Sequence, residues 1–191
     1  MKVIIPTIDL KKADQIARLM FYRAGMKCEI LVVEDTERKG WVKVINDTVR
    51  EYPDRYYVYA ADDAYPSRGF LKGAYDQMIS TGAGIVAFNE GKYQDLSAGF
   101  ALVDREWTKE VYGEDILFSG YKSHFSDVEI ALIAKAQGRY AYNPRNCLVE
   151  IVFDKDGPNP KSNNKDDYNL FYDRASKGFG GLTRPFVQTI R

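Results

Sequence analysis

The stretch YYVYAADDAYP, residues 56–66, joins a strand-like run to two adjacent carboxylates, Asp62 and Asp63, and then to a turn that ends in proline. Tyrosine and valine favour strands, so the first residues of this stretch predict a buried strand. Adjacent carboxylates repel each other, and their charges require a cation, hydrogen-bond donors or open water. We therefore expect a strand whose carboxyl end carries an acidic site.

The same alternation of strands and helices extends from this stretch toward the N-terminus. Short apolar runs at residues 2–6 and 28–36 are typical of buried strands, and helical spacing of apolar residues covers 9–26 and 40–52. Asp9 is placed to cap the first of these helices. This order predicts an α/β fold with a mostly parallel sheet, right-handed crossovers and flanking helices.

The alternation continues toward the C-terminus. The expected elements are a helix at 67–81, strands at 84–90 and 98–104, a helix at 126–138 and a strand at 147–154. Ser126 and Glu129 have the spacing of a capping box, which predicts that their side chains close the start of the 126–138 helix.

Length and composition indicate a single domain with a tail. The chain has 191 residues, of which 45% are hydrophobic and 28% charged, as in ordinary globular proteins. We expect a domain over residues 1–154 and a flexible loop and C-terminal tail over 155–191, because KDGPNPKSNNKDD is polar and contains prolines and asparagines. Basic residues there, among them Arg174 and Lys177, make this mobile tail a candidate lid over a bound diphosphate.

Charge, cysteine content and hydropathy bear on the partners and the cellular compartment of the protein. Lys plus Arg and Asp plus Glu both number 27, so the composition gives no general footprint for nucleic-acid binding. Cys28 and Cys147 are not in a metal-ligand spacing, which favours a reduced, cytoplasmic setting. We expect no membrane span, because no apolar run approaches a length of about 18 residues.

Polar residues follow three of the predicted strands, in the segments PTID, EDT and DDAYP. In open parallel sheets, ligands bind outside the carboxyl ends of the strands, where these segments converge. Mg²⁺ and Mn²⁺ prefer carboxylate oxygens and complete their coordination with substrate phosphates. The sequence therefore predicts a divalent cation, manganese or magnesium, that holds a diphosphate at this edge of the sheet.

The ordered segments VIIPT, LVVEDT, KVINDTV and YYVYAADDAYP resemble the donor-binding half of GT-A fold glycosyltransferases, most closely the inverting family-two type. SAGFALVDREW resembles the segment that shapes the acceptor site, and HFSDVEIALIAKAQG is similar to the helix start that supplies the catalytic base. The resemblance covers about residues 1–150. It implies a single-domain, Rossmann-like GT-A fold and metal-dependent hexosyl transfer, with inversion, from a nucleoside-diphosphate sugar to an acceptor hydroxyl.

The resemblance also implies roles for the residues at the strand ends. The nucleotide contacts that it implies are Pro6, Thr7, Glu34 and Asp35. The segment ADDAY departs from a strict DxD motif, because Ala64 stands where a second spaced carboxylate often occurs. We expect Asp63 to bind the metal directly, and Asp62 to contact the ribose or to act on the metal through water.

Two acidic residues in the first turn of the 126–138 helix are candidates for the catalytic base. Inverting transfer requires a base that removes the proton of the attacking hydroxyl. We expect Asp127 to be this base, with Glu129 as second choice because the capping box already accounts for it. His124 is the only histidine of the chain, and the resemblance permits it to be a third metal ligand.

Two other functions are compatible with these patterns. A sugar-phosphate nucleotidyltransferase shares much of the fold but requires a glycine-rich, arginine-containing loop after the first strand, and PTIDLKKAD contains no glycine. A non-catalytic nucleotide- or sugar-binding module would explain the degenerate DxD motif. For a transferase, the sequence is compatible with soluble, macromolecular and lipid-linked acceptors, and with a modified base in DNA.

Overall fold

A seven-stranded sheet of order β2-β1-β3-β6-β5-β7-β4 forms the centre of the protein in a computed structural model that describes residues 1–151 and 165–186. The strands are β1 (Lys2–Thr7), β2 (Glu29–Glu34), β3 (Tyr56–Tyr59), β4 (Ala64–Pro66), β5 (Ile85–Asn89), β6 (Ala101–Asp104) and β7 (Tyr140–Glu150). Strands β2, β1 and β3 pair in parallel, as do β5 and β7. The predicted α/β sheet is confirmed, but it is mixed rather than mostly parallel, because β6 lies antiparallel between β3 and β5, and β4 lies antiparallel to β7.

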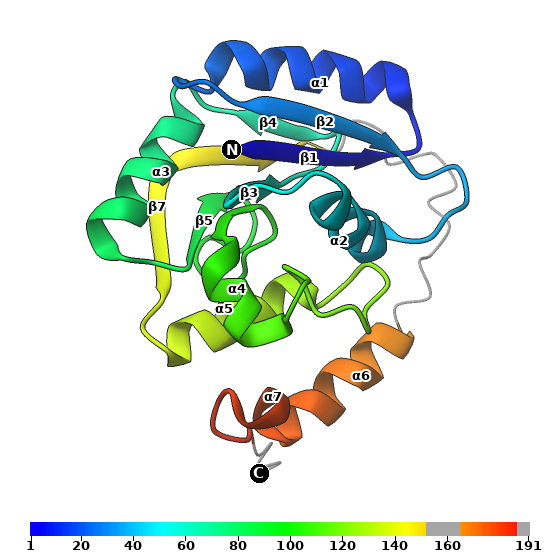
Figure 1. The fold of residues 1–191 in the computed structure, drawn as a ribbon, viewed down its shortest axis with the longest axis vertical. Helices are drawn as coiled ribbons and strands as arrows, with labels where there is room; N and C mark the ends of the chain where they lie inside the picture. The colour runs from blue at the N-terminus through cyan, green and yellow to red at the C-terminus, as the bar shows by residue number, and fades with distance from the viewer. Residues whose placement is uncertain (152–164, 187–191) are drawn as a thin grey trace.

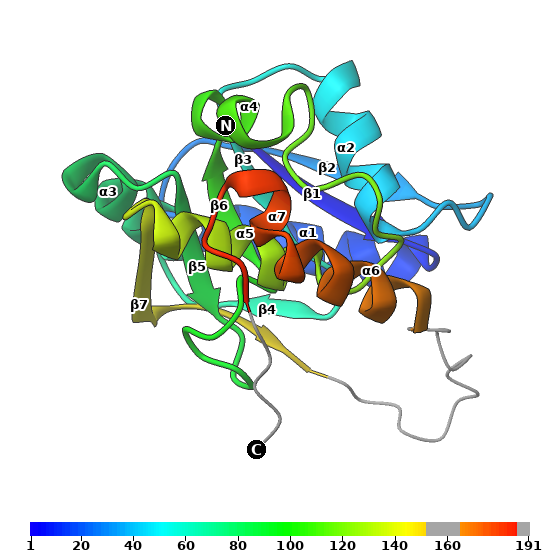
Figure 2. The same ribbon diagram turned by 90° about the horizontal axis from the view of Figure 1, so that it is seen from below.

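Helices cover both faces of this sheet (Figure 1). They are α1 (Leu10–Arg23), α2 (Trp41–Glu51), α3 (Phe70–Thr81), α4 (Arg105–Tyr112), α5 (Ser126–Ala136), α6 (Lys165–Ser176) and α7 (Gly178–Gly181). Helices α1 and α3 pack on one face, and α2, α4 and α5 pack on the other (Figure 2).

Alternation along the strands divides the core between these two faces. In β3, Val58 faces α1 and α3, whereas Tyr57 and Tyr59 face the opposite cluster, and all three side chains are fully buried. Asp9 caps α1 as predicted, because its side chain accepts a hydrogen bond from the backbone N–H of Lys12 at 3.1 Å. The buried strands thus fix the register that places their carboxyl ends at a common edge.

Within the region where the sequence predicts a flexible tail, residues 165–176 and 178–181 form helices that pack on the domain. Phe179 of α7 is 1% exposed and belongs to the same core cluster as α2, α4 and α5. Arg174 pairs with Glu129 and Lys177 with Asp173, so both basic side chains are engaged within the fold rather than free to cover a ligand. The predicted loop over 155–164 lies outside the described residues.

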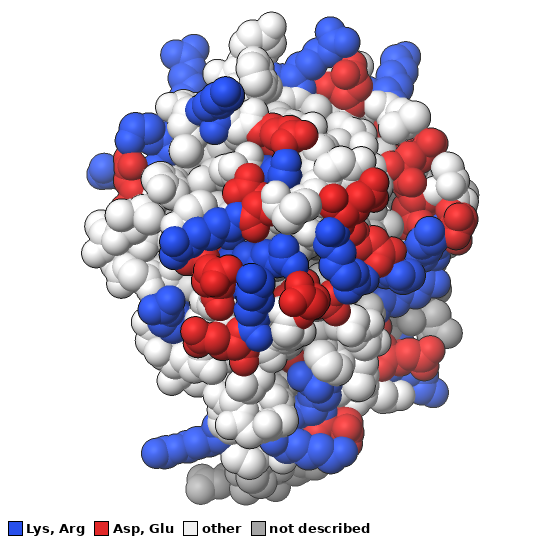
Figure 3. Space-filling view, viewed as in Figure 1, with Lys and Arg blue, Asp and Glu red and all other residues white. Residues whose placement is uncertain are grey.

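On the face that Figure 3 shows, Lys and Arg side chains lie among Asp and Glu side chains rather than gathering in one region. This mixture agrees with the equal numbers of acidic and basic residues in the sequence. Within residues 1–151 and 165–186, no helix combines the length and the apolar character that crossing a membrane requires. Cys28 and Cys147 are both free thiols.

Candidate functional site

The carboxyl ends of β1, β2 and β3 meet, as the sequence predicts. Thr7 at the end of β1 donates a hydrogen bond from its hydroxyl to Asp62, which follows β3, at 2.5 Å. The backbone N–H of Asp35, just beyond β2, donates to the carbonyl of Thr7 at 2.7 Å. Lys12 pairs with the other carboxylate oxygen of Asp62 at 2.7 Å. Thr7 is therefore the residue that joins the three predicted strand ends.

Asp35 organises the loop that leads into α2. Its carboxylate accepts hydrogen bonds from the backbone N–H groups of Lys39 at 2.8 Å and Gly40 at 3.0 Å. Gly40 has a φ of 99°, and a Cβ there would lie 2.6 Å from the carbonyl oxygen of Lys122. Only glycine fits both the conformation and the close approach. The Asp35 loop and the segment around Lys122 are consequently held against each other.

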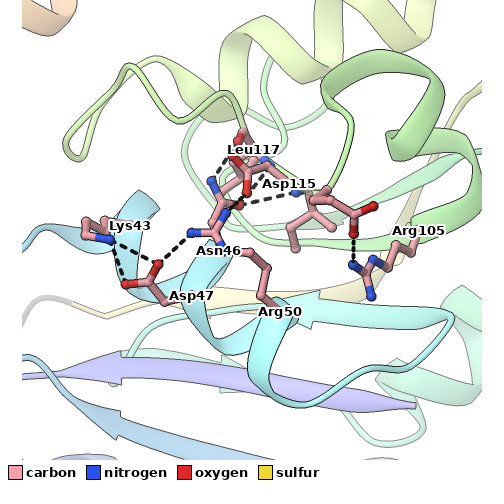
Figure 4. A network of polar contacts seen from close by, with 9 residues as sticks. Lys43, Asn46, Asp47, Arg50, Arg105, Asp115 and Leu117 are labelled. Carbon is pink, nitrogen blue, oxygen red and sulfur yellow. Dashed lines mark hydrogen bonds and ion pairs between the residues drawn. The ribbon is translucent and has the colours of Figure 1, made fainter.

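A buried asparagine holds the chain that leads to Lys122 (Figure 4). Asn46 of α2 is 1% exposed, and its side-chain oxygen accepts hydrogen bonds from the backbone N–H groups of Ile116 and Leu117, each at 3.2 Å. Its side-chain amide donates to the carbonyl of Leu117 at 2.8 Å. Both ends of the amide are satisfied, which fixes the segment between α4 and α5 against α2.

A cavity of about 340 Å³, here called the strand-end cavity, opens where these segments meet. Its walls include the predicted residues Pro6, Thr7, Asp35 and Asp62, together with Ile8, Arg38, Gly40, Trp41, Lys122 and Ser123. Both carboxylates already have partners, whereas Arg38 and Lys122 are exposed cations with no ion pair among the described residues. The cavity therefore presents available positive charge. Glu34 is exposed and lines a separate depression on the outer side of the Asp35 loop.

A second cavity of about 340 Å³, here called the acidic cavity, adjoins the first. The two share Trp41 and Ser123. Its walls carry Asp63, Glu90, Asp127 and Glu150 together with His124, and its other walls are Ala61, Tyr93, Gly99 and Phe100. Asp63 and Asp127, the metal ligand and the base predicted from the sequence, thus line one cavity with His124.

Strand pairing brings three of these carboxylates together. Asp63 leads into β4, whose first residue Ala64 lies opposite Glu150 of β7. The backbone N–H of Glu150 in turn donates to the carbonyl of Glu90, which follows β5, at 3.1 Å. Three strand ends that are far apart in sequence therefore deliver carboxylates to the same cavity.

Burial raises the pKa of two carboxyl groups that line the acidic cavity. Desolvation raises the pKa of Asp63, against an opposing attraction from Lys12, and the neighbouring carboxylates of Glu150 and Asp62 raise it further. Desolvation likewise raises the pKa of Glu90, and the negative charges of Asp127 and Glu150 add to that rise. A bound cation would relieve both the burial cost and the repulsion.

Asp127 lies at the boundary between the acidic cavity and a third, outer cavity of about 360 Å³. Burial raises the pKa of its carboxyl group, while backbone N–H groups and His124 oppose that rise. The outer cavity is lined by Tyr93, Leu96, Ser97, His124, Phe125, Asp127 and Val128. A carboxylate with a raised pKa between two openings is suited to accept a proton from a group in either one.

The predicted capping box at the start of α5 is wrong. Phe125, in the left-handed conformation at a φ of 67°, occupies the N-cap, and its side chain makes no capping hydrogen bond. Glu129 is fully buried and accepts hydrogen bonds from Tyr112 at 3.1 Å and Tyr121 at 2.7 Å, besides its pair with Arg174. Because three partners surround this carboxylate in the core, they take the place of the predicted local bond to the helix start.

The donor set of the acidic cavity fits a divalent cation that a substrate helps to hold. Within the described ranges, no three His, Cys, Asp or Glu side chains are arranged so as to hold a metal ion by themselves. Mg²⁺ and Mn²⁺ commonly use one or two carboxylates and take further oxygens from substrate phosphates and water. Asp63, next to the cation-flanked strand-end cavity, meets that requirement, and His124 lines the same space.

Comparisons with known proteins identify the fold. The mannosyltransferase PcManGT from Pyrobaculum calidifontis, solved in complex with GDP-Man and Mn²⁺, matches with a TM-score of 0.62 at 18% identity, over 82% of this chain and 57% of that chain. TarS from S. aureus matches with a TM-score of 0.65 at 12% identity, over 91% of this chain and 39% of that chain. The protein has a GT-A-like glycosyltransferase fold.

TarS 1-349 in complex with UDP also matches, with a TM-score of 0.51 at 13% identity, over 74% of this chain and 57% of that chain. The protein therefore covers between 39% and 57% of the length of these three structures. No protein-family model matches its sequence, and no curated protein sequence does so.

Several residues that line the two cavities are not indicated by the sequence patterns considered above. Glu90 follows β5, and Glu150 is the last residue of β7. The rule that ligands bind at strand ends, which located Asp63, would also find these two residues if the pairing of β5 with β7 were known. Arg38 and Lys122 lie in loops with no periodic signal. Trp41 is the first residue of α2, where an aromatic residue is read as core packing.

Proposed function

We propose that the protein is a metal-dependent glycosyltransferase that moves a sugar from a nucleoside-diphosphate sugar to an acceptor hydroxyl. The observation that carries this proposal is the joining of two unlike cavities through Trp41 and Ser123. One offers two cations, Arg38 and Lys122, that make no ion pair within residues 1–151 and 165–186, and the other offers carboxylates. A donor molecule has the same division, since its diphosphate is anionic and its sugar hydroxyl groups can donate hydrogen bonds to carboxylates.

The nucleotide and diphosphate belong in the strand-end cavity. Pro6, Thr7 and Asp35 form the wall nearest the strand ends, and Arg38 and Lys122 supply positive charge for an anionic ligand. Asp62 is held by Thr7 and Lys12, which suits a contact to the ribose. The similar folds of PcManGT, solved with GDP-Man, and of TarS 1-349, solved with UDP, support a nucleotide-sugar donor. Glu34, which points to another depression, is not part of this contact set.

Asp63 and His124 are the proposed protein ligands of a divalent cation, manganese or magnesium. PcManGT, whose fold is similar, was solved with Mn²⁺, which supports the proposal of a divalent cation. When bound, such a cation supplies positive charge that stabilises the departing diphosphate. Asp63 is half-buried in the wall of the acidic cavity and is adjacent in sequence to Asp62 of the strand-end cavity. A cation bound to Asp63 would therefore lie close to the diphosphate.

Asp127 is the proposed base of an inverting reaction. The acceptor oxygen forms a bond to the anomeric carbon while the bond from that carbon to the diphosphate breaks, and the hydroxyl proton passes to the Asp127 carboxylate. Its position between the acidic and outer cavities allows donor sugar on one side and acceptor on the other. Glu129 is surrounded by Tyr112, Tyr121 and Arg174 and lines neither cavity, so we assign it a structural role.

The competing functions predict different behaviour. A nucleotidyltransferase would act on a sugar phosphate and a nucleoside triphosphate, and a binding module would turn over neither. Two assays separate the three, each run with Mn²⁺ and with a chelator: hydrolysis of uridine- and guanosine-diphosphate sugars, and pyrophosphate release from a nucleoside triphosphate mixed with a sugar phosphate. We expect slow, Mn²⁺-dependent release of nucleoside diphosphate. Binding without any release over a full donor panel would favour the binding module, and pyrophosphate release from a triphosphate would favour the nucleotidyltransferase.

The acceptor enters through the outer cavity in this proposal. Tyr93, Leu96 and Phe125 give that cavity an apolar wall beside Asp127. Glycan, lipid-linked, protein and modified DNA acceptors all carry hydroxyl groups that this arrangement could activate. We further propose a cytoplasmic location, which the free thiols of Cys28 and Cys147 support.

A further inference from the structure

A buried carboxylate of α6 binds the backbone of the segment that lies between the strand-end cavity and the acidic cavity. Asp167 in the first turn of α6 is 6% exposed. Its oxygens accept hydrogen bonds from the backbone N–H groups of Lys122 at 2.9 Å, Ser123 at 2.9 Å and His124 at 2.8 Å. Three consecutive N–H groups directed at one carboxylate form a concave anion cradle. Hydrogen bonds to an ionised acceptor are among the stronger ones in proteins.

The segment that Asp167 holds contributes to both cavities. Lys122 and Ser123 line the strand-end cavity, and Ser123 and His124 line the acidic cavity. Their place in the donor site therefore depends on the path of three backbone units. A shift of about 1 Å in the peptide planes of residues 122–124 would move the Lys122 cation together with Ser123, which lines both cavities.

The opposite side of this segment is fixed by α2. The carbonyl of Lys122 accepts a hydrogen bond from the backbone N–H of Val42 at 3.2 Å and lies against Gly40, where no Cβ fits. The segment is thus held between the start of α2 and the start of α6. Asp35 orders the α2 side of the strand-end cavity, and Asp167 orders the side formed by Lys122 and Ser123.

Helix α6 has other anchors that do not involve Asp167. Arg174 pairs with Glu129, and Phe171 stacks on Phe125 with 5.1 Å between ring centroids. Ala175 is 5% exposed within the main core cluster. Loss of the Asp167 charge should therefore leave α6 docked while it releases the 122–124 segment.

We propose that Asp167 is a positioning residue for donor binding, acting through the backbone of residues 122–124. This inference rests on the proposed function, because it concerns the same nucleotide site. Asp167 touches neither donor nor acceptor; it sets where Lys122, Ser123 and His124 present themselves to the nucleoside diphosphate and to the cation beside it.

The test compares Asp167→Asn with Asp166→Asn. Asp166 is exposed in the same first turn of α6, so this control removes the same charge from the same helix end without disturbing the cradle. Backbone hydrogen exchange at residues 122–124, thermal melting, and calorimetric titration with UDP or GDP plus Mn²⁺ are measured for both variants. In Asp167→Asn we expect faster exchange at these three amides, a retained cooperative melt, and an affinity about 10- to 100-fold weaker. Asp167→Glu, which keeps the charge, should recover part of that affinity.

The outcomes separate this proposal from the proposed function. Wild-type protein that binds neither nucleotide would overturn the proposed function and with it the donor-binding role, while the exchange measurement would still report whether the cradle orders the segment. Wild-type binding with equal affinity in Asp167→Asn and faster exchange would overturn the positioning role alone. Unchanged exchange, or the loss of a cooperative melt in Asp167→Asn, would also overturn it.

Discussion

Arg174 of α6 makes a bidentate ion pair with Glu129 of α5, with Nε 2.8 Å and Nη2 2.7 Å from its two carboxylate oxygens. The side chain of Glu129 is completely buried and that of Arg174 is 18% exposed. The guanidinium also lies over the ring of Phe118, at 3.3 Å from its centroid. This pair joins the C-terminal helix to the helix that carries the proposed base.

Breaking this pair should destabilise the whole fold. Arg174→Leu leaves the Glu129 carboxylate buried without its cation, and the loss of one partner of a buried pair costs about 3–5 kcal/mol. Lys177→Ala is the matched control, because Lys177 pairs with Asp173 on the exposed side of the same helix, and surface pairs contribute about 0–1 kcal/mol. Chemical denaturation of both variants measures the difference. Equal unfolding free energies would show that α6 contributes little to the domain.

The metal assignment predicts the behaviour of Asp63→Ala. Without this carboxylate the cation keeps only His124 of its two proposed protein ligands, and the diphosphate charge is left poorly compensated. We expect titration of UDP or GDP to show no enhancement by Mn²⁺ in this variant, whereas wild-type protein shows one. Asp76→Ala, at an exposed position of α3, is the control for general charge loss. A folded Asp63→Ala variant with unchanged Mn²⁺-dependent affinity would contradict the assignment.

The strand ends could be predicted from the sequence because their signals are local. Thr7 and Asp62 each follow an apolar run, and the rule that parallel strands present their carboxyl ends together places them in contact, as the Thr7–Asp62 hydrogen bond confirms. Glu129 shows the limit of local reasoning. Its capping-box spacing with Ser126 is a local pattern, but Arg174, 45 residues away, offers a charged partner and determines the outcome.

The tail and the mixed sheet could not be predicted because both depend on distant pairings. The polar run over residues 155–167 indicates a loop, yet Asp167 at the end of that run lies in the first turn of α6 and is buried against residues 122–124. Likewise, the apolar residues of β6 give no sign of strand direction, and its antiparallel insertion between β3 and β5 follows from packing of the whole sheet.

The raised pKa of Glu90 predicts how stability changes with pH. A carboxyl group whose folded pKa is raised binds its proton more tightly in the native state, so stability falls as pH rises from the reference value of 4.5 to the raised native value. Glu90→Gln removes this loss and keeps an acceptor for the Ser97 hydroxyl, 3.1 Å from the Glu90 carboxylate. We expect the variant to be more stable than wild type at neutral pH and to lose that advantage below pH 4.5.

Thermal melts across this pH range test the prediction for Glu90. Glu106→Gln is the control, because Glu106 lies on the exposed surface of α4 with a side chain that is 61% exposed. An advantage of Glu90→Gln that grew as the pH fell would have the wrong sign, and would show that the Glu90 carboxylate stabilises the fold in its charged form.

The assignment of the base predicts that two neighbouring carboxylates of α5 behave differently. Asp127→Asn keeps the shape of the side chain but cannot accept the acceptor's proton, so transfer should fall by about 10²- to 10⁴-fold while donor and Mn²⁺ binding persist. Glu129→Gln should instead lower stability by about 1–3 kcal/mol, because the hydrogen bonds of Tyr112, Tyr121 and Arg174 lose a charged acceptor in the core. Turnover and melting measured for both variants decide the matter. A stable but inactive Glu129→Gln together with a fully active Asp127→Asn would move the base from Asp127 to Glu129.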